Sequence, residues 1–357
     1  MQVPPHSFLD LYRACSAPDA HPRTIVWEQF ASFFASNGLH IWNAIPGRLL
    51  AWAPPDSRPR APDGFSYRSP TDVDRSYDFC QQTIVLCPAR TIDGRDVVIR
   101  IVRIGDEGKH HEEALRRLAT GNVASVIGNH TAPVLQWLSL NAITFAVFPY
   151  LSSSDPTCLY LYEDTRDLLG HLDQMLEALE FCHARLIAHR DVFQQNFLCN
   201  FYGGIGFDRS AVPPPVGELV RPFRSLFPFR IYLIDFEWAI CFDPESDPAT
   251  RVVRGLPLPP DKKSLGAEYT RPIAPEMTSG LPYDPFLTDV WQLGTYFQSV
   301  AEENIIPAAA LRLFKRMAAV SPLARPTARE ALVELREIKS SLTLDEMRTP
   351  VWIRDNA

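Results

Sequence analysis

An aspartate and an asparagine stand five residues apart in the short run His189–Asn196, and a second aspartate follows in Ile234–Glu237. A carboxylate can orient an attacking hydroxyl group. A second carboxylate and a carboxamide can hold Mg²⁺ against a nucleoside triphosphate. We therefore expect a phosphoryl-transfer site built from Asp191, Asn196 and Asp235.

Three later motifs extend this pattern. They are Ala274–Glu276 (A-P-E), Asp289–Gly294 (D-V-W-Q-L-G) and Ser321–Thr327, which ends in R-P-T. Together with H-R-D-x-x-x-x-N and the following D-F-x, they resemble the protein kinase family. The whole pattern is similar to divergent kinase-like proteins found in large numbers in mushroom-forming fungi. The resemblance covers roughly residues 25 to 340.

The resemblance implies a role for each matching residue. Asp191 would accept or orient the proton of the substrate hydroxyl, and Asn196 and Asp235 would bind Mg²⁺ and, through it, ATP. The closest match to the lysine of V-A-I-K, which contacts the α- and β-phosphates, is Arg100. Arginine keeps the charge of lysine but is longer and planar.

Other matching positions would support the fold. The resemblance implies an ion pair between Glu276 and Arg325, and it implies that Asp289 braces the loop that contains His189 and Arg190. Breaking a buried ion pair of this kind costs about 3–5 kcal/mol.

The chain also departs from the family. The glutamate that should pair with Arg100 is either replaced by His111 or supplied by Glu112, depending on the register of the helix. No glycine-rich phosphate loop is found: residues 65–83 contain no glycine. Phe193 stands where the family has a lysine, and Glu237 replaces the glycine of D-F-G. These losses reduce charge neutralisation, so we expect phosphoryl transfer to be weak or lost.

Hydrophobic periodicity predicts strands before residue 150 and helices after it. Strands are expected at Thr83–Leu86 and Asp96–Val102 around a tight turn at Asp93-Gly94. The remaining expected elements are strands at 134–138 and 142–151 and helices at 110–119, 168–179, 286–302, 308–319 and 327–340. This order predicts an α+β fold of two lobes like that of protein kinases, with a small antiparallel-sheet N-lobe and a larger helical C-lobe.

We divide the chain accordingly into an N-terminal extension, an N-lobe, a C-lobe and a tail, at residues 1–75, 76–150, 151–343 and 344–357. The extension holds an aromatic helix at Trp27–Phe34, expected to pack on the core, and a Pro-rich linker at 53–72. Residues 201–230 form an insertion, and the sequence does not indicate its role.

Composition excludes several classes of function. The net charge of −7 argues against binding to nucleic acid or to an anionic membrane. The longest apolar run, Ala142–Leu151, is too short to span a bilayer, and the N-terminus lacks the pattern of a secretory signal. Seven scattered cysteines are typical of reduced thiols, so we expect an intracellular protein.

These observations predict an atypical protein-kinase domain that binds Mg-ATP and transfers the γ-phosphate to Ser or Thr hydroxyls of proteins. One alternative is an inactive pseudokinase that acts as a binding scaffold. A second is a small-molecule kinase, because Ile234–Ala239 is also similar to the metal-binding strand of choline and aminoglycoside phosphotransferases. The sequence indicates neither a substrate nor a protein partner.

Overall fold

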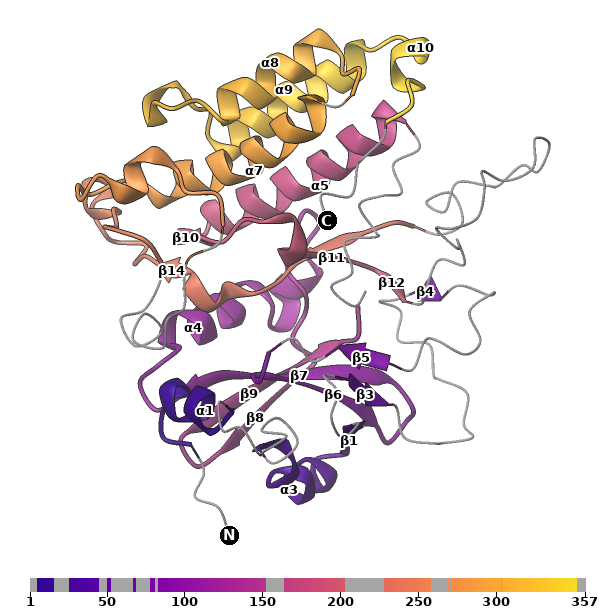
Figure 1. The fold of residues 1–357 in the computed structure, drawn as a ribbon, viewed down its shortest axis with the longest axis vertical. Coiled ribbons are helices and arrows are strands. Elements are labelled where there is room, and N and C mark those ends of the chain that lie inside the picture. The colour runs from indigo at the N-terminus through magenta and orange to yellow at the C-terminus, as the bar shows by residue number, and fades with distance from the viewer. Residues whose placement is uncertain are drawn as a thin grey trace, which may run out of the picture. The chain divides into compact units, whose positions relative to one another are not determined.

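The computed structural model has a mixed α+β fold, with an antiparallel five-stranded sheet and a set of α-helices (Figure 1). It describes residues 5–15, 26–44, 50–52, 67–68, 78–80, 83–151, 164–202, 228–257, 269, 271–302 and 304–351. The chain divides into two compact units. The first contains residues 1–112, 132–153 and 199–221, and the second contains 113–131, 154–198 and 222–357.

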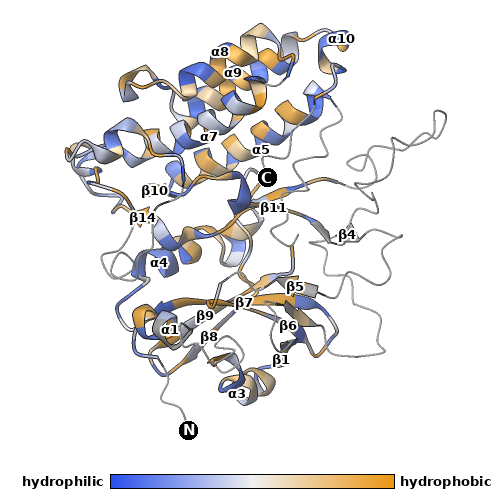
Figure 2. Cartoon of the chain, in the orientation of Figure 1, coloured by the Kyte–Doolittle hydropathy of each residue, from blue (hydrophilic) through white to orange (hydrophobic). Residues whose placement is uncertain are grey.

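The five-stranded sheet of the first unit has the strand order β1-β6-β7-β9-β8, and every neighbouring pair is antiparallel. The strands are β1 (Leu39–Ile41), β6 (Leu86–Thr91), β7 (Asp96–Ile104), β8 (Gln136–Leu140) and β9 (Ile143–Pro149). Hydropathy colouring shows that the central strands are mostly apolar (Figure 2).

The hairpin between β6 and β7 is present as predicted. Arg90 and Asp96 are paired across it and form a buried ion pair of 2.8 Å. Gly94 adopts a φ of +87°, which glycine tolerates without strain. The strand predicted at Thr83–Leu86, however, begins only at Leu86 and continues to Thr91. It includes Pro88, whose carbonyl accepts a 3.0 Å hydrogen bond from the backbone N–H of Trp42. Proline has no N–H to return this bond, and β1 ends at Ile41, one residue before Trp42.

Two short helices cover one face of this sheet. In α3 (Ala31–Ser36), Phe34 packs with the preceding Trp27 and Phe30 against Phe145 of β9. All four aromatic rings are buried, so the prediction that this aromatic segment packs on the core is confirmed. Helix α1 (Phe8–Cys15), which the sequence did not predict, joins the same core through its buried residue Leu11.

The described residues between β1 and β6 include further short strands. Part of this stretch forms a second antiparallel sheet of strands β2 (Asn43–Ala44), β3 (Leu50–Trp52) and β5 (Asp78–Cys80). In the predicted linker, β4 (Tyr67–Arg68) pairs in parallel with β12 (Phe201–Tyr202), and the other linker residues lie outside the described ones. The predicted insertion is described only at residues 201–202 and 228–230.

The second unit is mainly helical. Its long helices are α5 (Thr165–His183), α7 (Pro285–Glu302), α8 (Ala308–Met317) and α9 (Ala328–Ser341), close to the predicted positions, and α4 (Lys109–Leu118) crosses the boundary between the units. The predicted apolar stripe of α5 is fully buried. Asp164 caps α5 by accepting from Asp167 N, and Thr327 caps α9 by accepting from Glu330 N.

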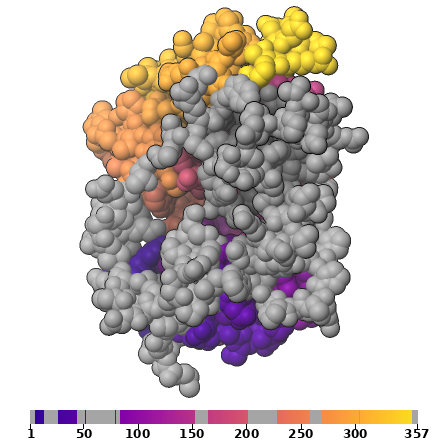
Figure 3. Space-filling view, turned by 45° about the vertical axis from the view of Figure 1, so that its right-hand side comes forward, coloured from indigo at the N-terminus to yellow at the C-terminus, as the bar shows by residue number. Residues whose placement is uncertain are grey.

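Residues assigned to a tail are part of this unit. Helix α10 (Leu344–Met347) follows α9, and the carbonyl of Thr349 accepts a 2.9 Å hydrogen bond from the backbone N–H of Thr165. Val351 is buried. In the space-filling view, the described C-terminal residues are the orange and yellow atoms at the top (Figure 3). None of the described helices is long and apolar enough to cross a membrane.

Gly294, on α7, allows that helix to pack closely against the end of α8. A Cβ at Gly294 would lie 2.5 Å from Met317 Cβ and 2.8 Å from the backbone N of Ala318, closer than side-chain carbons approach their neighbours. Gly294→Ala should therefore destabilise the fold by about 1–3 kcal/mol. Gly170, inside α5, is the control because a Cβ there meets nothing within 4 Å. Gly170→Ala should stabilise by about 0.4–1 kcal/mol in urea denaturation. Equal effects of the two substitutions would contradict this packing role of Gly294.

Candidate functional site

Two short β-ladders of the second unit position the candidate residues. Strand β10 (Ile187–Ala188) pairs with β14 (Ile240–Cys241), and β11 (Phe197–Cys199) pairs with β13 (Ile231–Leu233). The loop between β10 and β11 carries Asp191 and Asn196, and the segment between β13 and β14 carries Asp235. Because the strands at both ends of these connections are paired, the loop and the segment must lie against each other.

Asp191 and Asn196 are in direct contact. Asn196 Nδ2 donates to Asp191 Oδ2 and to the Asp191 carbonyl, each at 2.8 Å. The Asn196 carbonyl accepts from the backbone N–H of Ile234 at 2.9 Å, which places Asp235 next to this pair. The structure thus brings together the three residues that the sequence singled out for the site.

His189 joins the two segments. Its Nε2 lies 2.9 Å from the carbonyl oxygen of Ile234, and its Nδ1 accepts from the backbone N–H of Asp191 at 3.2 Å. A backbone N–H can only donate, so Nδ1 is unprotonated and Nε2 carries the proton. The fully buried ring also packs edge-on against Phe236, with ring centroids 4.8 Å apart. His189 therefore has a structural role in fixing the spacing of the loop and the segment.

Asp289 braces the loop from α7, as the resemblance implied. Its Oδ2 accepts from His189 N at 2.8 Å, and its Oδ1 accepts from Arg190 N at 2.7 Å. His183 Nε2 lies 2.9 Å from the same Oδ2. Asp289 is fully buried, and these contacts satisfy its carboxylate.

Gln292 is a second brace that sequence reasoning missed. It lies one helical turn after Asp289 and is equally buried. Its Oε1 accepts from Val192 N at 3.0 Å, and its Nε2 donates to Tyr269 Oη at 2.6 Å and to the Pro272 carbonyl at 3.3 Å. The sequence signal that could have indicated it is the placement of two polar residues, Asp289 and Gln292, three positions apart on a largely apolar face of the helix.

Two residues of the site have left-handed backbones. Arg190 has a φ of +65° and Asp235 a φ of +64°, conformations that are unfavourable for residues other than glycine. Such strain persists only where the surrounding structure enforces it, and it is concentrated at functional sites. Here Asp289 and the Asn196–Ile234 hydrogen bond supply that enforcement.

The environment of Asp191 shifts its titration. Burial raises the pKa of Asp191 above its ordinary value of 3.8, and Asp235 acts in the same direction. Arg271, whose Nε lies 3.3 Å from Asp191 Oδ1, opposes this shift, as does the hydrogen bond from Asn196. A carboxylate with a raised pKa is a better proton acceptor than an ordinary one.

The donor set fits a magnesium ion. Asn196 donates both of these hydrogen bonds through Nδ2, and its Oδ1 accepts no hydrogen bond from any described residue. An amide oxygen beside the carboxylates of Asp191 and Asp235 is the oxygen-rich environment that Mg²⁺ prefers. Glu237, in the 3₁₀ turn after Asp235, adds a further carboxylate to this segment.

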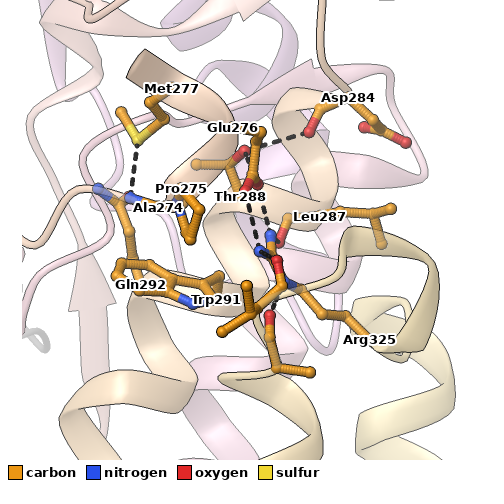
Figure 4. Close-up of polar contacts among 12 residues, drawn as sticks. Ala274, Pro275, Glu276, Met277, Asp284, Leu287, Thr288, Trp291, Gln292 and Arg325 are labelled. Atoms are coloured by element: carbon orange, nitrogen blue, oxygen red, sulfur yellow. Dashed lines mark hydrogen bonds and ion pairs between the residues drawn. The ribbon is translucent and has the colours of Figure 1, made fainter. Parts of the chain in front are cut away.

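The A-P-E and R-P-T motifs meet in the expected ion pair (Figure 4). Arg325 donates to Glu276 Oε1 at 2.5 Å and to Oε2 at 2.9 Å. The remaining donors of Arg325 reach the carbonyls of Leu287, Ala319 and Val320. The guanidinium group is fully buried, so the carboxylate of Glu276, rather than water, must compensate its positive charge.

Arg100 and its expected helix partner belong to the first unit. Arg100 is buried on β7, on the face opposite to Ile99 and Ile101. Of the two candidate partners, His111 is buried, and Glu112 accepts from Arg103 Nη1 at 3.1 Å.

No protein-family model matches the sequence, and no curated protein matches it. The case for any function therefore rests on the residues and geometry described above.

Replacing Asp191 by asparagine should raise stability at neutral pH. The raised pKa means that the folded protein binds this proton more tightly than the unfolded chain. The ionised carboxylate therefore costs stability above the folded pKa, and this cost disappears below the unfolded value. We expect Asp191→Asn to melt above the wild type at pH 7, with a gap that closes towards pH 4. A variant that melts well below the wild type at pH 7 would contradict the conclusion that burying the ionised Asp191 carboxylate lowers the stability of the fold.

Glu276→Gln should destabilise the second unit by about 3–5 kcal/mol, because it leaves the buried Arg325 charge without a counterion. Burial alone would raise the pKa of Glu276, but the hydrogen bonds and the positive charge of Arg325, together with a backbone hydrogen bond and the hydroxyl of Thr288, outweigh burial, and the net pKa is lowered. The pair therefore stabilises the protein above the ordinary pKa and loses this effect as the pH falls through the folded pKa.

The exposed pair Arg316–Glu334 is the matched control. Glu334→Gln should cost less than about 1 kcal/mol in the same denaturation assay. Similar costs for the two substitutions would show that burial does not set the strength of the Glu276–Arg325 pair.

Proposed function

We propose that this chain is an atypical protein-kinase-like domain that binds Mg-ATP and transfers the γ-phosphate to Ser or Thr hydroxyls of a protein. The observation that carries the proposal is the convergence of Asp191, Asn196 and Asp235 on two loops locked by paired strands. Each is the residue type that the chemistry requires at that place.

The surroundings support the same family. The order of β7, α4 and two further strands matches that of the kinase strand that bears the lysine, the C-helix and the sheet that follows. The bonds from Asp289 to the loop and the Glu276–Arg325 pair belong to motifs of the protein-kinase large lobe. These features favour a protein kinase over a small-molecule kinase.

The residues divide the chemistry among themselves. Asp191 would orient the attacking hydroxyl and take up its proton, with its second oxygen held by Asn196. Asn196 Oδ1 and the carboxylate of Asp235 would hold Mg²⁺, which neutralises charge on the transferring phosphate when bound. His189 and Asp289 keep the loop fixed while this happens.

One observation favours a second candidate, a nucleotide-binding scaffold without transfer. Phe193 replaces the lysine that the family uses near the phosphate, and Glu237 adds negative charge close to Asp235. Both changes oppose transfer more than they oppose metal binding.

Millimolar Mg-ATP should raise the melting temperature of the wild type by several degrees, because a ligand at about 100 times its dissociation constant adds roughly 2.7 kcal/mol. Asp235→Asn should abolish this shift, and chelation of Mg²⁺ should do the same in the wild type. Asp191→Asn is the matched control, and it should keep the shift while losing transfer of labelled γ-phosphate. An undiminished shift in Asp235→Asn would contradict the assignment of Asp235. A shift without transfer in the wild type would favour the scaffold.

A further inference from the structure

A cation lies beside Asp191, although the loop itself lacks the expected lysine. Arg271 precedes Pro272 in the segment that leads to the A-P-E motif. Its Nε lies 3.3 Å from Asp191 Oδ1, and its Cζ lies 4.6 Å from the centre of the Phe193 ring. Phe193, which replaces the lysine, thus supports a guanidinium group by a cation–π contact.

Arg271 has donors to spare. Its hydrogen bond to Asp191 uses Nε, and Nη1 and Nη2 donate to no described residue. The side chain is 27% exposed, whereas that of Asp191 is 9% exposed. A guanidinium group offers a planar fork that matches the oxygens of a phosphate. The open end of Arg271 is therefore suited to an anion that approaches Asp191.

The backbone around Arg271 is held in place. Gln292 donates to Tyr269 Oη and to the Pro272 carbonyl, on either side of Arg271. Tyr269 Oη also lies 3.3 Å from the carbonyl oxygen of Arg190. The cation is consequently tied to the same loop and the same helix that position Asp191, so its place beside the carboxylate is fixed before any ligand binds.

We propose that Arg271 binds the γ-phosphate of ATP and supplies the positive charge that Phe193 cannot. This inference rests on the proposed function. In the transfer step, the substrate hydroxyl oxygen forms a bond to the γ-phosphorus, and the bond to the β–γ bridging oxygen breaks. ADP leaves with that electron pair, and the hydroxyl proton passes to Asp191. Arg271 stays protonated and neutralises charge on the γ-phosphate oxygens.

The proposal distinguishes ATP from ADP, because only ATP carries the γ-phosphate. We would measure the dissociation constants of Mg-ATP and Mg-ADP by calorimetry, and the single-turnover rate of phosphate transfer to a generic Ser/Thr protein substrate. Arg271→Ala should weaken Mg-ATP about tenfold or more, as expected for a hydrogen bond to a charged group, and leave Mg-ADP unchanged. It should slow transfer by about 100-fold or more.

Two further variants make the test specific. Phe193→Lys in the Arg271→Ala background returns a cation to the place where the family has one, and it should restore most of the preference for ATP. Arg254→Ala removes a positive charge from an exposed arginine that binds the Gly280 carbonyl, and it should change neither nucleotide affinity.

Each outcome has one meaning. If the wild type binds neither nucleotide, the proposed function fails and the role of Arg271 fails with it. If the wild type binds both and Arg271→Ala keeps the preference for ATP, only the role of Arg271 is overturned. An equal loss of ATP and ADP affinity would also overturn it, since that result indicates a structural role. Loss of the ATP preference in a protein without turnover would support the γ-phosphate contact and reject the transfer step.

Discussion

The candidate site depends on one buried carboxylate. The side chain of Asp289 is fully buried, and polar oxygens at such a place are tolerated only where hydrogen bonds satisfy them. Two of its three donors are successive backbone N–H groups, of His189 and Arg190, and the second of these residues has a left-handed backbone. The need to satisfy this carboxylate therefore fixes the conformation of the loop that carries Asp191.

Helix α7 also holds a second segment in addition to the loop. Gln292, one turn after Asp289, binds Val192 of the loop with its oxygen and the segment around Tyr269 and Pro272 with its nitrogen. A carboxamide can accept a hydrogen bond from the N–H of one segment and donate one to the carbonyl of another, whereas a carboxylate can only accept. The loop and the segment before the A-P-E motif are thereby held by one face of one helix.

Sequence reasoning found the features that are local or carried by motif spacing. The five-residue interval between Asp191 and Asn196, the apolar stripe of α5 and the Asp93-Gly94 hairpin all follow from short-range patterns. Long-range relations were accessible only where a motif encoded them, as for Glu276 and Arg325. Strands β2, β3 and β5 were missed because strands of two or three residues leave no measurable period. Arg271 was missed because nothing in its own neighbourhood indicates that it contacts Asp191.

The absence of a lysine at position 193, where the resemblance led us to expect one, is thus an incomplete guide to the electrostatics of the site. Asp191 and Asp235 repel each other, and this repulsion contributes to the raised pKa of Asp191. A site with two carboxylates and no cation would resist the approach of an anion. Arg271 offsets part of this charge from a different segment, and the Phe193 ring supports its guanidinium group. The sequence shows no cation at position 193, but the fold places the positive charge of Arg271 beside Asp191. The charge around Asp191 therefore depends on the segment before the A-P-E motif, which Gln292 of α7 binds, as well as on the loop.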